Sequence, residues 1–260
     1  MNNEDRSPLK AKPLRTPGQS VEEAKAKLIE DAFETPALLA MCMLMLAFFE
    51  WFRVIFSLPP KPVLFTIVAA VAVGFAVWRW FRVRRQTRAL RQAIEGEKVV
   101  GQFLESLRER GYRVFHDLIG EGFNVDHVLI GPAGVFTIET KTWSKPRRGD
   151  ARIEFDGETI RAGGLEPDRD PIIQASAQAA WLKALLTEST GKPFSVWPVI
   201  VFPGWFVEPC IDRKRRIWVL NPRALPAFLD REPRRVSDED VALASFHLSR
   251  FVRSGEAQRP

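Results

Sequence analysis

A short β-hairpin is the feature of this sequence that most constrains its fold. Two strand-like runs, Phe123–Ile130 and Val135–Lys141, flank a Gly-Pro-Ala-Gly turn at residues 131–134. Glycine and proline between runs of β-branched and aromatic residues are typical of a hairpin turn. If the pairing is centred on the Pro-Ala step, Asp126 lies directly opposite Glu139, and the two carboxylates share one face.

Two facing carboxylates need charge compensation. Directly opposed side chains have Cβ atoms ~5 Å apart, where like charges destabilise the pair unless a cation lies between them. Side chains alternate along a strand, so Lys141 projects to the same face as Glu139 and adds an ammonium group. The plainer alternative is a solvated hairpin with a surface ion pair. Both faces are rich in apolar residues, however, which favours a central strand and a divalent cation between the acids. The apolar residues of the opposite face are Val125, Leu129, Phe136 and Ile138.

Two long apolar runs, Pro36–Leu58 and Pro62–Phe81, precede this hairpin. Each is long enough to cross a hydrocarbon core of ~30 Å as a helix, and together they are placed too late and too close to each other for a cleaved signal peptide. We therefore expect a transmembrane helical hairpin at about 36–58 and 62–81. The positive-inside rule then places both termini and the remaining domain on the cytoplasmic side of a bacterial inner membrane. The arginines behind this assignment are Arg79, Arg82, Arg84, Arg85, Arg88 and Arg91.

Charge and cysteine content narrow the function only slightly. The net charge of +6 and the pI near 9.6 permit nucleic-acid binding, but anionic lipid explains the arginine run equally well. Cys42 and Cys210 are far apart in the sequence, so neither a disulfide framework nor a cysteine metal site is expected, which suits a reducing cytosol. Glu50 and Arg53 can pair along one helix face. A local ion pair in an anchor is favoured over a transport role.

The order of elements after residue 92 is that of an α/β domain. A helix at Gln92–Arg110 places Glu97 on its apolar stripe, and a helix at about Ile172–Thr187 places Gln174 and Gln178 on one stripe. These amides either turn inward or solvate the first helical turn. Further strands are expected at 112–117, 152–155, 158–160, 196–202 and 216–220, and further helices at 222–229 and 237–253.

The segments expected from this pattern number five. They are a cytoplasmic, partly disordered N-terminal segment (1–34), the two transmembrane helices (35–82), a basic juxtamembrane linker (83–92), the α/β domain (93–205) and a C-terminal extension that packs on it (206–260).

Four sequence blocks in this order resemble the nuclease-related domain, NERD, a member of the PD-(D/E)XK nuclease-like superfamily. The resemblance covers about residues 93–205, and the order and spacing are more specific than any block alone. The blocks are Gly96-Glu97, the run from Phe123 to Pro132, the run from Gly134 to Lys141, and the run from Asp170 to Gln174. The proline that usually precedes the motif aspartate is replaced by Val125.

The resemblance implies a restriction-endonuclease-like fold, a mixed sheet flanked by helices, with a metal-dependent phosphodiester hydrolase site. It implies that Asp126, Glu139 and Glu97 hold Mg²⁺ or Mn²⁺ and that Lys141 and Gln174 complete the catalytic set. His127 would face the other side of the sheet, as a core histidine with a fixed tautomer and not as a base. The basic loop residues Lys145, Arg147 and Arg148 could hold the phosphate backbone without reading sequence.

The function expected from this resemblance is that of a membrane-anchored, Mg²⁺-dependent nuclease acting on the cytoplasmic side. Its expected partners are nucleic acid, most readily DNA, and membrane lipid, and the hairpin could oligomerise. The alternative is a non-catalytic module that binds nucleic acid or a protein through a nuclease-like fold.

Overall fold

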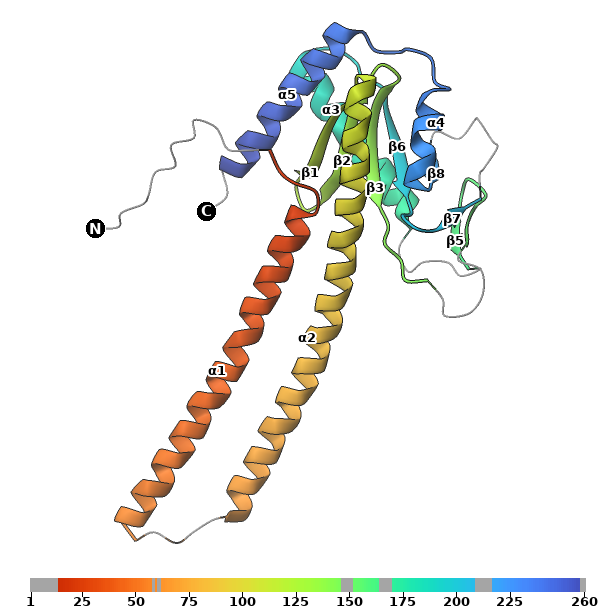
Figure 1. Cartoon of the computed structure of the whole chain (residues 1–260). Helices are drawn as coiled ribbons and strands as arrows, with labels where there is room; N and C mark the ends of the chain where they lie inside the picture. Colours follow the sequence, from red (N-terminus) through yellow and green to blue (C-terminus); the bar gives the residue numbers. More distant parts are fainter. Residues whose placement is uncertain are drawn as a thin grey trace, which may run out of the picture. The chain divides into compact units, whose positions relative to one another are not determined.

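The computed structural model describes residues 14–57, 59, 62–145, 152–163, 170–208 and 217–257. The chain forms two compact units. One contains Met1–Ser20 and Ala93–Pro260, and the other contains Val21–Gln92. Figure 1 labels the elements of both units.

The second unit consists of two long helices (Figure 1). Helix α1 spans Gln19–Ile55 and helix α2 spans Pro62–Glu105, so each also reaches into the first unit. Arg79 Nη2 of α2 donates a 2.8 Å hydrogen bond to the Asp31 carbonyl oxygen of α1. None of the residues whose burial is described between 21 and 92 is buried. The hydrophobic core of the protein therefore lies in the first unit.

The expected membrane hairpin is wrong. Across the described ranges, no helix combines the length and the apolar composition that a membrane crossing requires. Both apolar runs belong to helices that extend far beyond them and carry charged side chains. Glu50 and Arg53 form the expected ion pair, with 2.9 Å between Oε1 and Nη1. Placement in a bacterial inner membrane, which rested on these two runs, is overturned with them.

The basic segment 83–92 was expected as a juxtamembrane linker and is instead regular helix within α2. Two arginines of this part of α2 stack on tryptophans one turn earlier. The Arg82 guanidinium lies 5.5 Å from the centre of the Trp78 ring, and that of Arg84 lies 5.1 Å from Trp80. Such cation–π contacts give the arginines a role within their own helix.

The first unit is built on a five-stranded sheet of order β1-β2-β3-β6-β8. The first three strands are antiparallel, while β3 pairs with β6 and β6 with β8 in parallel. This confirms the expected mixed sheet flanked by helices. The strands are β1 (Arg113–Ile119), β2 (Asn124–Gly131), β3 (Gly134–Thr140), β6 (Val196–Val201) and β8 (Trp218–Leu220).

Helices cover both faces of this sheet (Figure 1). Helices α3 (Pro171–Thr190) and α5 (Asp238–Ala257) pack on one face through residues such as Leu182 and Leu248. The last turns of α2 pack on the other face through Leu104, together with the short helix α4 (Leu225–Leu229). Apolar burial on both faces explains why β2 and β3 lack the simple polar–apolar alternation of a surface hairpin.

The hairpin register is the predicted one. His127 pairs with Ile138, Ile130 with Val135, and Gly131 with Gly134, so the turn is centred on the Pro-Ala step. Position 131 requires glycine, because a Cβ on Gly131 would lie 2.2 Å from the Tyr112 ring. Continuing the same register places Asp126 opposite Glu139.

A second, three-stranded sheet of order β5-β4-β7 lies beside the first. The Asp-Gly turn at 156–157 connects β4 (Arg152–Phe155) to β5 (Ile160–Ala162), as the sequence indicates. Strand β7 (Phe206–Val207) was not expected. The inner face of this sheet packs on Phe202 and Trp205. It extends the core beyond β6 and helps to fix the end of the main sheet.

Helix α3 begins and ends at clear sequence signals. The Asp170 side chain accepts a hydrogen bond from the Ile172 backbone N–H, Pro171 occupies the first turn, and Gly191 ends the helix at φ +71°. A capping aspartate and a following proline fix where the first helical turn starts. This start determines which α3 side chains reach the hairpin.

The close approach of α2 to the segment after β3 depends on Gly96. A Cβ at this position would lie 1.8 Å from Thr142 Cγ2. We expect Gly96→Ala to destabilise the protein by about 1–3 kcal/mol, because the contact must open. Gly74→Ala on the same helix is the matched control, since no atom lies within 4 Å of its added methyl group.

Chemical denaturation measures both variants. Thr142→Ser, which removes Cγ2, should restore most of the stability lost in Gly96→Ala. Equal unfolding free energies for Gly96→Ala and Gly74→Ala would contradict the tight contact.

Candidate functional site

The predicted acid pair lies at the end of the sheet where β2 begins and β3 ends. Asp126 and Glu139 are 6% and 4% exposed. Asp126 Oδ2 accepts a 2.8 Å hydrogen bond from the Thr140 backbone N–H, so its carboxylate reaches across to β3. The hairpin thus brings the two acids together inside the protein, as the sequence predicts.

Three side chains hold the Glu139 carboxylate. Oε1 accepts hydrogen bonds from Lys141 Nζ at 2.7 Å and from Gln174 Nε2 at 2.8 Å. Oε2 accepts one from Gln178 Nε2 at 2.6 Å. Lys141 Nζ also donates to Gln174 Oε1 at 2.9 Å. Hydrogen bonds to a charged group are among the stronger ones in proteins, so this network fixes the orientation of Glu139.

Glu97 joins the pair from α2. It is 5% exposed, and its Oε2 atom has no hydrogen-bond partner. Burial raises the pKa of Glu97 from 4.5 to about 7, with further increases from the nearby charges of Asp117 and Glu139. A hydrogen bond from the Gly18 backbone and the charge of Lys141 lower this pKa in part. Glu97 is therefore a neighbour of the acid pair, as expected from its position on the apolar stripe.

Mutual repulsion among these carboxylates is a defining property of the site. Burial raises the pKa of Asp126 well above its usual value, and the charges of Glu139 and Glu97 raise it further. In the part of the chain that the structure describes, no three acids, histidines or cysteines are arranged as ready ligands for a metal ion. The three acids are thus close enough to repel one another without converging on one point.

Gln178 also belongs to the site. The sequence places it on the same helix stripe as Gln174, but the predicted catalytic set does not include it. Besides Glu139, its Nε2 donates to the Asn124 carbonyl oxygen at 2.9 Å. It is 2% exposed. One turn separates it from Gln174, so two amides of α3 clamp one carboxylate. The spacing was a sufficient signal, since both glutamines lie on the same inward stripe.

Asp117 is a second missed residue, and no sequence signal identifies it. It lies within β1 at the position opposite Asp126, is fully buried, and has φ +51°. The ladder pairs on either side of it are present, His116 with His127 and Leu118 with Val125. A non-glycine residue in this left-handed region costs about 1–3 kcal/mol and marks a conformation that the surroundings impose. The twist turns the Asp117 carboxylate toward Arg15 and Ser20.

The proposed phosphate-contacting residues are only partly described. Lys145 is exposed at the end of the segment that follows β3. Arg147 and Arg148 lie outside the described residues. The structure therefore shows that Lys145, four residues after Lys141 in the sequence, is exposed, and the contacts of all three residues with phosphate stay predictions.

His127 faces away from the acids, as expected. Its Nδ1 lies 2.9 Å from His116 Nδ1, and His116 Nε2 lies 2.8 Å from Glu105 Oε1. Burial lowers the pKa of His127 well below its usual value, and burial also lowers that of His116. Both rings are therefore neutral core histidines, and the contact of His127 with His116, on the side of β2 away from the acids, argues against His127 as a base for the acid site.

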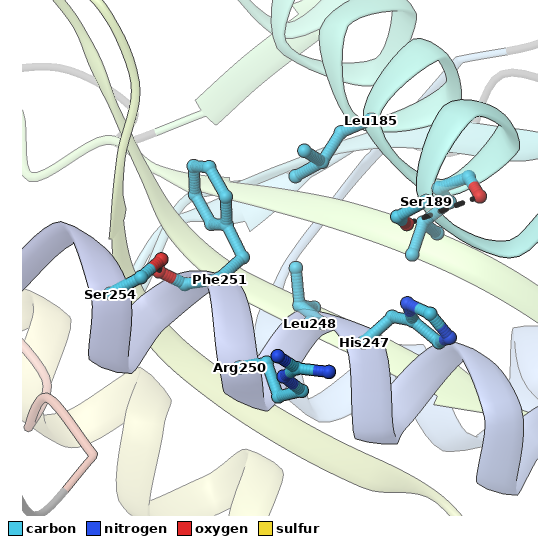
Figure 2. A pocket seen from close by; sticks show the side chains of 8 residues that line it. Leu185, Ser189, His247, Leu248, Arg250, Phe251 and Ser254 are labelled. Carbon is cyan, nitrogen blue, oxygen red and sulfur yellow. Dashed lines mark hydrogen bonds between the residues drawn. The ribbon is translucent and has the colours of Figure 1, made fainter.

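A cavity of about 270 Å³ lies elsewhere, between α3 and α5 (Figure 2). Figure 2 shows Leu185 and Phe251 over its apolar part and His247 and Arg250 along α5. None of the predicted site residues lines it. This cavity is therefore separate from the acid site.

The raised pKa of Glu97 predicts a pH-dependent stability. Folding favours the protonated form, so the contribution of Glu97 is full below its unfolded pKa of 4.5 and is lost as the pH rises through about 7. We expect the wild type to lose on the order of 2 kcal/mol relative to Glu97→Gln between pH 5 and pH 8. The comparison cancels the opposite contribution of the two histidines.

Urea unfolding of both proteins in chelator-containing buffer measures this difference. Parallel stability–pH curves for the wild type and Glu97→Gln would contradict the burial of an ionisable Glu97.

Comparison with known proteins is informative for one part of the chain. Residues 92–203 match the family model of the nuclease-related domain, NERD. No curated protein and no solved structure matches the chain. The matched residues include α2 from Gln92 onward, the β2–β3 hairpin and α3, which together contribute Glu97, the acid pair and both glutamines. Residues 92–203 of this chain are therefore similar to the nuclease-related domain.

Proposed function

We propose that this protein is a metal-dependent nuclease that hydrolyses phosphodiester bonds through the acid site. The observation that carries the proposal is the buried network in which Lys141 and Gln174 both contact Glu139, beside Asp126 and Glu97. A lysine held against a carboxylate and next to further acids is costly to bury without a use. The nuclease-related domain supports the same reading.

The residues fit a hard divalent cation such as Mg²⁺ or Mn²⁺. All the acidic donors are carboxylate oxygens, the ligand type these ions prefer. The Glu97 Oε2 atom is buried and without a partner. Burial and then repulsion between the acids raise the pKa values of Asp126 and Glu97, and a cation would relieve the repulsion. Asp126, Glu139 and Glu97 would hold the ion, and they must draw closer than they lie in this structure to do so.

The chain's own side chains have separate parts in this chemistry. A bound divalent cation would offset charge on the phosphoryl oxygens and make a water molecule more acidic. The Lys141 side chain, 19% exposed at the edge of the network, would stabilise negative charge that develops on the phosphate. Gln174 holds Lys141 and Glu139 in one geometry through both ends of its amide. Lys145 would contact the phosphate backbone without reading sequence.

A second candidate function is binding of nucleic acid without cleavage. Two observations favour it: the described acids are not arranged as a ready metal group, and Asp126, Glu139 and Glu97 are each at most 6% exposed. In this case the acid network would serve the stability of a nuclease-like fold. Metal binding separates the two candidates.

Cleavage of defined DNA and RNA substrates tests the first candidate. We expect Mg²⁺- or Mn²⁺-dependent hydrolysis by the full chain, reduced at least ~100-fold in Lys141→Ala because transition-state charge loses its stabilising ammonium. Lys183→Ala, which removes an exposed lysine from α3, should retain wild-type rates.

Asp126→Asn is the second arm of this assay and should be equally inactive. Equal hydrolysis by the wild type and both site variants would mean a contaminating enzyme. Nucleic-acid binding without hydrolysis by any of the proteins would support the second candidate function.

Calorimetric titration with Mn²⁺ tests the metal site itself. We expect one binding event in the wild type that is lost in Asp126→Asn and in Glu139→Gln, because each removes a negative ligand. Binding should also release protons near pH 7, since the pKa of Glu97 is about 7 and a bound cation favours its ionised form. Unchanged Mn²⁺ binding in both variants would refute this assignment of the ligands.

A further inference from the structure

The segment Arg15–Ser20, here called the strap, packs against the acid site. It belongs to the same compact unit as the nuclease-related domain. The sequence places it in an N-terminal segment expected to be disordered, yet Arg15 and Gly18 are buried. Helix α1 begins within it, at Gln19. A stretch of six residues from the N-terminal region is therefore part of the surroundings of the site.

Asp117 anchors the strap from β1. Its Oδ2 atom accepts hydrogen bonds from Arg15 Nε at 2.7 Å and from the Ser20 backbone N–H at 2.8 Å. Its Oδ1 atom accepts one from Ser20 Oγ at 2.5 Å. Asn124 Nδ2 donates to both Ser20 Oγ and Asp117 Oδ1, at 3.0 and 3.2 Å. One carboxylate, in a backbone conformation rare for aspartate, thus collects the hydrogen bonds that hold both ends of the strap.

The middle of the strap lies over Glu97. The Gly18 backbone donates a hydrogen bond to the Glu97 carboxylate, and a Cβ on Gly18 would lie 3.6 Å from Glu97 Oε2. Gly18 has φ +74°, which suits glycine and strains other residues. The strap therefore contributes directly to the burial of one of the three acids.

Gly101 of α2 forms the seat for the strap. A Cβ at this position would lie 2.4 Å from Pro17 Cγ and 2.7 Å from Pro17 Cβ. Proline is rigid, so it cannot yield to an added methyl group as a long side chain would. The absence of a side chain at Gly101 is thus what allows the strap to lie this close to Glu97.

We propose that the strap is an autoinhibitory cover of the acid site, with Asp117 as the positioning residue that holds it closed. A phosphodiester cannot reach carboxylates that are at most 6% exposed, so some element must move before substrate enters. The strap contacts the domain through the Asp117 side chain, the Glu97 carboxylate and the surface at Gly101, and residues 14–18 are not in strand conformation.

The test compares Gly101→Ala with Gly74→Ala in the full chain. Both add one methyl group to α2, but only the first displaces Pro17. Two readouts require no catalysis: trypsin cleavage after Arg15, identified by mass spectrometry, and carbodiimide modification of Glu97. We expect cleavage and modification to be at least ~10-fold faster in Gly101→Ala, because a modest shift of the equilibrium between closed and open strap raises the open population about tenfold. Asp117→Asn, which weakens the anchor without the steric change, should act in the same direction if Gly101→Ala fails to fold.

The inference rests on the proposed function only for its activity readout, which is Mg²⁺-dependent hydrolysis. A rise in hydrolysis in Gly101→Ala together with faster labelling supports the cover. Faster labelling with hydrolysis at the wild-type rate overturns the autoinhibitory role, and equal labelling in the two glycine variants overturns the closed strap itself. If neither protein hydrolyses nucleic acid, the proposed function fails, while faster labelling in Gly101→Ala still supports a movable cover over Glu97.

Discussion

Repulsion among buried carboxylates is the constraint around which this domain is organised. Asp126, Glu139 and Glu97 come from two strands and one helix, and burial, followed by the charges of neighbouring carboxylates, raises the pKa values of Asp126 and Glu97. Such a group is stable only if hydrogen bonds and counter-charges offset its desolvation. Each neighbouring element contributes to this. Helix α3 donates two side-chain amides, β3 donates a backbone N–H and is followed by Lys141, and the strap donates the Gly18 backbone N–H. The hydrogen bonds that join these elements are thus the same ones that hold the acids of the site.

The hairpin and the acid pair could be predicted from the sequence because their signals are local. The Pro-Ala turn fixes the register, and the register fixes which side chains face each other. The α3 amides were visible for the same reason, since helical spacing places Gln174 and Gln178 on one stripe. Asp117 and the strap could not be found in this way. Nothing in the sequence announces a left-handed aspartate within a strand, or a distant segment that supplies its partners, and β7 is too short to give a pattern.

The expected membrane anchor shows the opposite weakness of a local signal. Each apolar run was judged by itself, whereas the structure places the first run as far as Ile55 and all of the second inside helices of 37 and 44 residues that also carry charged side chains. The same continuity changes the meaning of the arginines, which belong to α2 and stack on its tryptophans. Helix α2 then continues as far as Glu105 and carries Glu97 on its way. The sequence composition suggested a transmembrane helix, a linker and a separate helix from Gln92 onward, and these parts form the single helix α2 as far as Glu105.

The contact between His116 and His127 fixes where the protons of both rings lie. An ionised Glu105 carboxylate can only accept a hydrogen bond. His116 Nε2 must therefore carry the hydrogen, and Nδ1 of the same neutral ring is left as an acceptor. His127 must then donate from Nδ1, which leaves a lone pair on its buried Nε2, the atom found without a partner. A carboxylate at the end of α2 thereby dictates the tautomer of a ring whose backbone neighbour is Asp126. The two faces of β2 therefore differ. On one face His127 and His116 form hydrogen bonds with fixed tautomers, and on the other face Asp126 is close to the charges of Glu139 and Glu97.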